Sequence, residues 1–124
     1  MAVVHTVEMF SKIPEGQEFP AGATIFNKGD TGAVMYGIIE GTVVMQVDGK
    51  TVETIHAGDV FGEGALVHPD GLRRSAAIAQ TDCKVAVLDE ERFKFLIENT
   101  PTFAIDVMRS YSNRLLKFKH PKAG

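Results

Sequence analysis

Short apolar runs separated by turn sequences dominate the chain between residues 18 and 88. The runs are rich in Val, Ile and Thr. They recur about every 8 to 12 residues, which is the spacing typical of an all-β domain. We expect strands at 24–26, 34–39, 42–47, 51–56, 75–79 and 84–88. Since no helical pattern alternates with these runs, they favour an antiparallel jelly roll over a parallel α/β sheet.

Two dipeptides in this block predict β-hairpins. Asp48-Gly49 is the stronger signal, because a type I′ turn requires positive φ at both central residues and Asp-Gly tolerates it. Glu40-Gly41 predicts a second hairpin, which would place the strands at 34–39 and 42–47 side by side.

Helical patterns lie on both sides of the β block. Near the N-terminus, Val3, Val7 and Phe10 fall on one face of a helix that ends before Pro14. After the block, Asp89 can cap a helix over residues 90–99. The apolar stripe expected on that helix is Phe93, Leu96 and Ile97.

A second C-terminal helix is predicted from Pro101, which suits the first turn of a helix, to about residue 119. Its apolar positions follow alternating steps of four and three residues: Ala104, Met108, Tyr111, Leu115 and Phe118. We expect this seam to pack against the roll. A lid over a bound ligand, or a dimer seam, is the alternative.

The expected fold is mainly β: an antiparallel double-stranded β-helix (jelly roll) with an N-terminal helix and two C-terminal helices. The chain has 124 residues and is 44% apolar, which fits one domain with one core. We divide it into an N-terminal helical segment at 1–17, a β-roll at 18–88 and C-terminal helices at 89–120.

Charge and cysteine content narrow the class of protein. The net charge of −3 argues against coating of a nucleic acid, which needs many Lys and Arg side chains. The lone Cys83 lies in an apolar run, so we expect it to be a small buried residue. A single cysteine cannot form an internal disulfide, which favours a reducing compartment. The N-terminus lacks the continuous apolar stretch of a signal peptide or membrane span, so we expect a cytoplasmic protein with no membrane segment.

Two glycine-containing stretches, 21–32 and 57–77, resemble the cyclic nucleotide-binding domain family. That family includes bacterial catabolite regulators, regulatory subunits of cyclic-nucleotide-dependent kinases and cyclic-nucleotide-gated channels. In it, Phe-Gly-Glu followed by Arg-Ser-Ala forms the phosphate-binding cassette, here residues 61–77. The resemblance covers nearly the whole chain and implies a ligand-sensing domain.

The resemblance also implies a role for individual cassette residues. Glu63 would accept a hydrogen bond from the ribose 2′-hydroxyl, beside the Gly62 amide. The phosphate oxygens would be held by the Ala65 and Ser75 amides and the Arg74 guanidinium. Val60 and Leu66 would wall the base and sugar.

The chemistry of the ligand agrees with these residue types. A planar guanidinium offsets the desolvation of a cyclic phosphodiester better than an ammonium group does, which makes Arg74 our candidate. The small residues at 62–65 let backbone N–H groups approach the same phosphate where a short helical turn begins. A carboxylate such as Glu63 is the natural acceptor for a hydroxyl proton.

The chain departs from the family pattern at two places, Gly64 and the loop over residues 67–72, which is longer than in the tightest family examples. Gly64 stands where the family has a bulky aliphatic residue, which removes a packing contact and could weaken signalling while binding survives. Arg73 directly precedes Arg74, so a shift of one residue is the alternative assignment. The Ser-Ala pair after Arg74 favours Arg74.

For the ligand we favour cAMP slightly over cGMP, since a hydroxyl at Ser75 can also reach a guanine edge. Tyr111 or Arg114 could cover the base. We expect no metal or further cofactor, because the four histidines lack ligand spacing. No serine lies in a nucleophile-elbow sequence, so we expect no catalysis.

The function expected is that of a sensor or regulatory domain: a cyclic nucleotide binds and the C-terminal helix moves. A protein partner or a missing effector domain would read this movement, since no DNA-binding motif is present. Two alternatives remain. One is a degenerate roll that serves as a protein-interaction scaffold without nucleotide binding. The other is a sugar- or metal-binding jelly-roll enzyme, which the absent histidine cluster disfavours.

Overall fold

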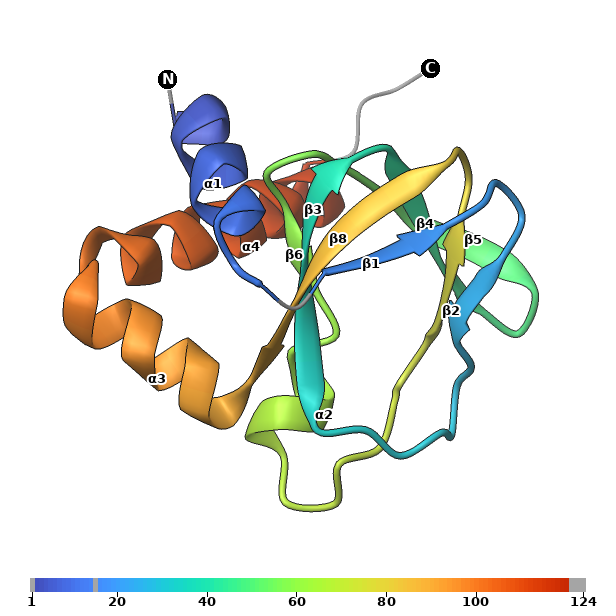
Figure 1. Ribbon diagram of the computed structural model, residues 1–124. Coiled ribbons are helices and arrows are strands. Elements are labelled where there is room, and N and C mark those ends of the chain that lie inside the picture. The colour runs from blue at the N-terminus through green and yellow to red at the C-terminus, as the bar shows by residue number, and fades with distance from the viewer. Residues whose placement is uncertain (1, 15, 121–124) are drawn as a thin grey trace.

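Two four-stranded antiparallel sheets pack face to face (Figure 1). The computed structural model describes the backbone of residues 2–14 and 16–120, with side chains from residue 6 onward. The strands are β1 Gly16–Phe19, β2 Thr24–Phe26, β3 Val34–Glu40, β4 Thr42–Val47, β5 Lys50–His56, β6 Val60–Phe61, β7 Ala76–Ala79 and β8 Cys83–Asp89. One sheet has the order β1-β8-β3-β6 and the other β2-β7-β4-β5. The mainly β, jelly-roll architecture is confirmed.

The sequence missed two strands. β1 is largely exposed and carries Gly, Gln and Glu, so it shows no apolar alternation; it is held by pairing with β8. β6 has only two residues, Val60 and Phe61, and pairs with β3. Strands this short depend on backbone pairing across the sheet, which leaves little trace in composition.

One predicted hairpin is confirmed and the other is wrong. Asp48 and Gly49 both have positive φ, at 52° and 80°, and they join the paired strands β4 and β5. Glu40-Gly41 instead links strands of different sheets, because β3 pairs with β8 and β6 while β4 pairs with β5 and β7. Gly41 has φ of 99°, and a Cβ there would lie 2.4 Å from the Asp82 carbonyl oxygen. The chain therefore changes sheets at a point where only glycine fits.

The core consists of two clusters on either side of the first sheet. Inside the roll, the rings of Phe26, Tyr36 and Phe61 stack with centroids 5.1 to 6.1 Å apart. On the other side, Phe10 and Phe103 meet edge to face at 6.1 Å. This second cluster joins the sheet to the helices.

Three helices cover that outer side of the first sheet (Figure 1): α1 Ala2–Ser11, α3 Glu90–Asn99 and α4 Thr102–Lys119. The Asp89 cap is confirmed, since its carboxylate accepts a hydrogen bond from the Arg92 amide at 2.7 Å. The stripe expected on α3 packs into the helix-side cluster: Phe93, Leu96 and Ile97. On α1, Phe10 is buried, and the Val3 side chain lies outside the described residues.

The apolar seam expected on α4 faces the roll only in part: Tyr111 packs into the helix-side cluster. Met108, Leu115 and Phe118 are 66%, 52% and 56% exposed. The buried positions on this helix are Phe103, Ser110 and Arg114. Ser110 and Arg114 can face the roll because the roll supplies hydrogen-bond partners for both.

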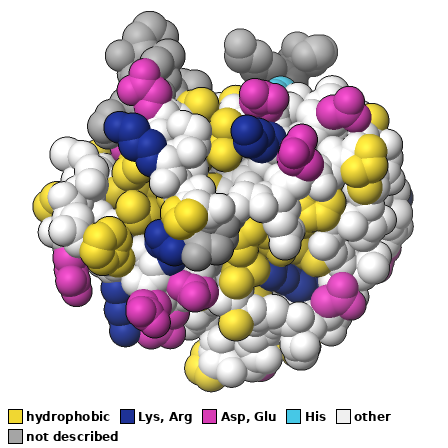
Figure 2. Space-filling view, in the orientation of Figure 1, with side chains coloured by type: hydrophobic (Ala, Val, Ile, Leu, Met, Phe, Trp, Pro, Cys, Tyr) yellow, Lys and Arg dark blue, Asp and Glu magenta, His cyan; other side chains and the backbone are white. Residues whose placement is uncertain are grey.

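The visible surface has no dominant charge. Figure 2 shows basic, acidic and hydrophobic side chains interspersed over one face of the molecule. Cys83 is buried, as expected, at 4% exposure. Within the described ranges, no helix is long and apolar enough to cross a membrane.

Candidate functional site

A cavity of about 420 Å³ lies between the roll and α4. Its walls come from the cassette, from β4 and β5, and from the C-terminal half of α4. The lining residues are Met45, Val52, Glu53, Phe61, Gly62, Glu63, Ser75, Tyr111, Arg114, Leu115 and Phe118. Apolar side chains form much of this wall. Its charged groups are the carboxylates of Glu53 and Glu63 and the guanidinium of Arg114.

Arg73 lies behind the cassette wall and is only 5% exposed. Its Nη1 donates to the Gly62 carbonyl oxygen at 2.8 Å, and its Cζ lies 4.2 Å from the centroid of the Phe26 ring. Among the described residues, this is the one hydrogen-bond acceptor for its five N–H groups. Burial lowers the pKa of Arg73, but a guanidinium remains charged at physiological pH. A buried cation with unused donors therefore lies directly behind Gly62, which lines the cavity.

Glycines make room for this side chain. A Cβ at Gly32 would lie 2.6 Å from Arg73 Nη2, and a Cβ at Gly62 would lie 2.8 Å from Nη1. The backbone of Arg73 is fixed from the other glycine stretch, since its amide donates to the Asp30 carbonyl and its carbonyl accepts from the Gly29 amide, both at 2.8 Å. The two stretches that stand out in the sequence thus build one arginine pocket.

The expected inward position of Arg74 is wrong. Its side chain is 54% exposed, and its Nη2 forms an ion pair with Asp70 Oδ2 at 3.1 Å on the outside of the loop. Hydrogen bonds from the Leu72 amide and from Arg74 lower the pKa of Asp70. Neighbouring residues of an extended chain point to opposite sides, so Arg73 faces inward and Arg74 outward.

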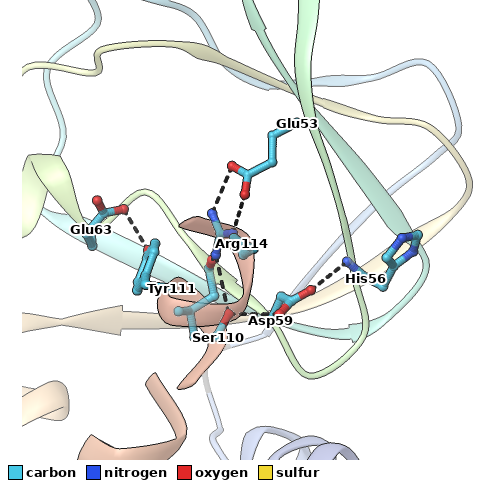
Figure 3. Close-up of polar contacts among 8 residues, drawn as sticks. Glu53, His56, Asp59, Glu63, Ser110, Tyr111 and Arg114 are labelled. Atoms are coloured by element: carbon cyan, nitrogen blue, oxygen red, sulfur yellow. Dashed lines mark hydrogen bonds and ion pairs between the residues drawn. The ribbon is translucent and has the colours of Figure 1, made fainter. Parts of the chain in front are cut away.

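Glu63 lies where the cassette turns into the short helix α2, Gly64–Val67. Its Oε1 accepts a hydrogen bond from the Tyr111 hydroxyl at 2.6 Å, which ties the cassette to α4 (Figure 3). Burial raises the pKa of Tyr111, and the charge and hydrogen bond of Glu63 raise it further, so the phenol stays protonated. The expected hydroxyl acceptor is therefore already engaged by a hydroxyl of the protein.

The other cassette positions lie as follows. Ala65 is buried at 5% exposure. A Cβ at Gly64 would meet only His68, at 3.6 Å, so a side chain would fit there. The first amides of a helix have no partner within it, which leaves those of Gly64 and Ala65 pointing ahead of α2. The cassette thus presents N–H groups as well as a buried arginine.

Two expected wall residues lie elsewhere. Val60 and Leu66 pack in the cluster beneath the helices, because successive residues of β6 face opposite sides and Phe61 takes the cavity side. Ser75 does line the cavity, as expected. Sequence reasoning missed Glu53 and the aromatic pair Phe26 and Tyr36, because their relation to the site depends on which strands pair in the two sheets.

Arg114 connects α4 to two strands of the roll, β5 and β6 (Figure 3). Its Nε and Nη2 donate to the two carboxylate oxygens of Glu53, at 2.5 and 3.1 Å, and its Nη1 donates to the Val60 carbonyl. Its Cζ also lies 4.4 Å from the centroid of the Tyr111 ring. Burial alone would lower the pKa of Arg114, but the hydrogen bonds and charge of Glu53 outweigh it and raise the pKa.

Ser110 adds a polar contact beside this ion pair. Its Oγ donates to Asp59 Oδ1 at 2.8 Å, while Asp59 Oδ2 accepts from the His56 amide (Figure 3). The side chains that close the cavity therefore all come from α4, and their partners all come from the roll.

The family model described as "Cyclic nucleotide-binding domain" matches residues 16–100 of the chain. The Pycsar effector protein XpPycTIR of Xanthomonas perforans is 30% identical over 113 residues. The cAMP-dependent protein kinase regulatory subunit of Schizosaccharomyces pombe is 37% identical over 93 residues. The structure of the Thermus thermophilus catabolite activator protein superposes with a TM-score of 0.70 at 25% identity.

These relatives are longer than the chain. The matches cover 91%, 74% and 93% of the chain, but only 37%, 21% and 56% of the effector, the kinase subunit and the activator, respectively. The similarity thus concerns the domain that the three proteins share with the chain.

Proposed function

Because the chain belongs to the cyclic nucleotide-binding domain family, we propose that it binds a cyclic nucleotide monophosphate in the cavity under α4 and performs no chemistry on it. One observation carries the proposal. At one end of a cavity whose remaining wall is largely apolar, the cassette places the Glu63 carboxylate and Gly62, and the buried guanidinium of Arg73 lies directly behind Gly62.

In this proposal Arg73 takes the role that the sequence suggested for Arg74. A buried guanidinium offsets the charge of a cyclic phosphodiester where water cannot. The amides of Gly64, Ala65 and Ser75 are the candidates for the remaining phosphate contacts, and Gly62, with φ of 81°, lets the ligand approach the backbone closely.

Glu63 is proposed to accept the ribose 2′-hydroxyl. Tyr111 donates to this carboxylate, so ligand and α4 compete for one acceptor. A nucleotide that takes Glu63 releases Tyr111, which shifts the equilibrium of α4 toward a different position. Tyr111 is then free to cover the base, and Arg114 can join it once Glu53 releases its guanidinium. A protein partner or an effector segment is proposed to read the change.

Calorimetric titration with cAMP, cGMP and AMP tests the proposal. We expect at least one cyclic nucleotide to bind, and AMP to bind at least about tenfold more weakly, because its open phosphate leaves buried groups unpaired. Binding of AMP as tight as that of both cyclic nucleotides contradicts the proposed cassette. Absence of all binding favours the scaffold alternative.

Replacing Tyr111 with phenylalanine should tighten binding. The variant keeps the ring but removes the hydroxyl that occupies Glu63, and a hydrogen bond to a charged group is worth enough to change the affinity roughly tenfold. Competition with a fluorescent cyclic nucleotide measures the effect. Ser112→Ala, an exposed position on the same helix, is the matched control. Weaker binding by Tyr111→Phe would show that the hydroxyl serves the ligand and does not compete with it.

A further inference from the structure

Glu53 is a half-buried carboxylate of the cavity wall that takes no part in the proposed phosphate and ribose contacts. It lies on β5, opposite Met45 of β4, and its side chain is 18% exposed. It lines the cavity together with Val52, Leu115 and Phe118. Both of its oxygens face the guanidinium of Arg114 (Figure 3).

The position of Glu53 follows from the proposed function, on which this inference rests. With the phosphate and ribose held at Gly62 and Glu63, the base must occupy the rest of the cavity. That part is walled by the apolar side chains of Met45, Val52 and Phe61, and Glu53 is the acidic group within it. A carboxylate in an apolar pocket discriminates strongly between ligands that do and do not offer it donors.

The contact between Glu53 and Arg114 indicates which base fits. Arg114 presents two parallel N–H donors to the two carboxylate oxygens. The N1–H and N2–H groups of guanine form the same arrangement of two adjacent donors. The corresponding edge of adenine has one donor, at N6, and an acceptor lone pair at N1 that would face the second carboxylate oxygen.

We propose that Glu53 is a specificity-determining residue that selects guanine over adenine by exchanging the Arg114 guanidinium for the N1–H and N2–H edge of the base. This reverses the slight preference for cAMP expected from the sequence. The exchange does not leave Arg114 without partners, because the Ser110 hydroxyl and the Tyr111 ring belong to the same helix and move with it. The base edge and α4 thus compete for Glu53.

Calorimetry on the parent and Glu53→Gln with cGMP and cAMP tests this proposal. The parent should prefer cGMP roughly ten- to a hundredfold, the discrimination expected of one bidentate contact to a base. In Glu53→Gln the amide offers one donor and one acceptor, which match adenine, so the preference should fall to unity or invert. Glu40→Gln, an exposed glutamate at the end of β3, should keep the parent preference.

Two results would overturn the inference while leaving the proposed function intact. One is a parent that binds cAMP as well as cGMP. The other is a Glu53→Gln variant in which both affinities change by the same factor. Failure of the parent to bind any cyclic nucleotide removes the proposed function and the inference with it.

Cyclic IMP gives a test that needs no variant. Its base keeps N1–H and lacks the N2 amino group, so it offers Glu53 one donor where guanine offers two. We expect the parent to bind cyclic IMP clearly more weakly than cGMP. Equal affinity would contradict a two-donor contact even if Glu53→Gln failed to fold.

Discussion

Arg73→Ala should weaken cyclic nucleotide binding by roughly thirtyfold or more. Truncating one partner of a buried, hydrogen-bonded charge pair costs about 2 to 5 kcal/mol, and 1.4 kcal/mol is about a factor of ten. Arg73 is the buried guanidinium beside Gly62, so its loss would leave the phosphate charge without its counter-charge. Calorimetric titration of the variant with cGMP and cAMP measures the loss.

The adjacent arginine supplies the control. Arg74→Ala removes an exposed side chain whose partner is Asp70, so binding should change little. Arg73→Lys keeps the charge and loses the planar fork, and we expect an affinity between those of the parent and the alanine variant. Thermal unfolding of all three variants separates lost binding from lost folding. A large loss in Arg74→Ala with parent affinity in Arg73→Ala would restore the original assignment.

Phe103→Ala should destabilise the fold by about 3 to 5 kcal/mol, the usual cost of removing a fully buried aromatic ring. Phe103 is 0% exposed and packs edge-on against Phe10 of α1 and Phe93 of α3, with ring centroids 6.1 and 5.7 Å away. It therefore joins all three helices at the base of α4. Urea unfolding followed by circular dichroism measures the free energy of unfolding.

Phe95→Ala is the matched comparison for Phe103→Ala. Phe95 is the same residue type in the same helical layer, but its side chain is 57% exposed. Its replacement should change the free energy of unfolding by about 0.5 kcal/mol or less. Similar losses in the two variants would mean that the helices are not anchored to the roll through Phe103.

Glu63 and the start of α2 were predictable from sequence because they depend on neighbours in the chain. The expected short helical turn is observed at Gly64–Val67, directly after Glu63. The acceptor role of Glu63 toward a nucleotide remains a prediction. The structure adds that a protein hydroxyl, from Tyr111, reaches this carboxylate from 48 residues further along the chain. No local pattern could indicate that contact.

The choice between the two arginines illustrates where sequence reasoning failed. Ala76 and Ala77 do not indicate which face of the strand is buried, because they are the same residue type. The apolar Ile78 favours burial of its own face, which is also the face of Arg74. In the structure Ala77 and Ala79 fill the core, while Ile78 faces outward beside Val44 and Thr24 on the neighbouring strands. The register of β7 between β2 and β4 decides which side each residue faces, and a shift of one residue reverses it.

The sequence by itself determined what short-range physics controls: the run of β-strands, the Asp48-Gly49 turn, the Asp89 cap and the bounds of α3 and α4 to within a residue. Each of these depends on φ preferences or hydrogen bonds between residues a few positions apart. Only the tertiary structure decided that α4 turns Arg114 inward, and that Glu53 on β5 meets it. An apolar stripe cannot predict a buried charge, because that burial is stable only when a distant strand brings the opposite charge to the same place.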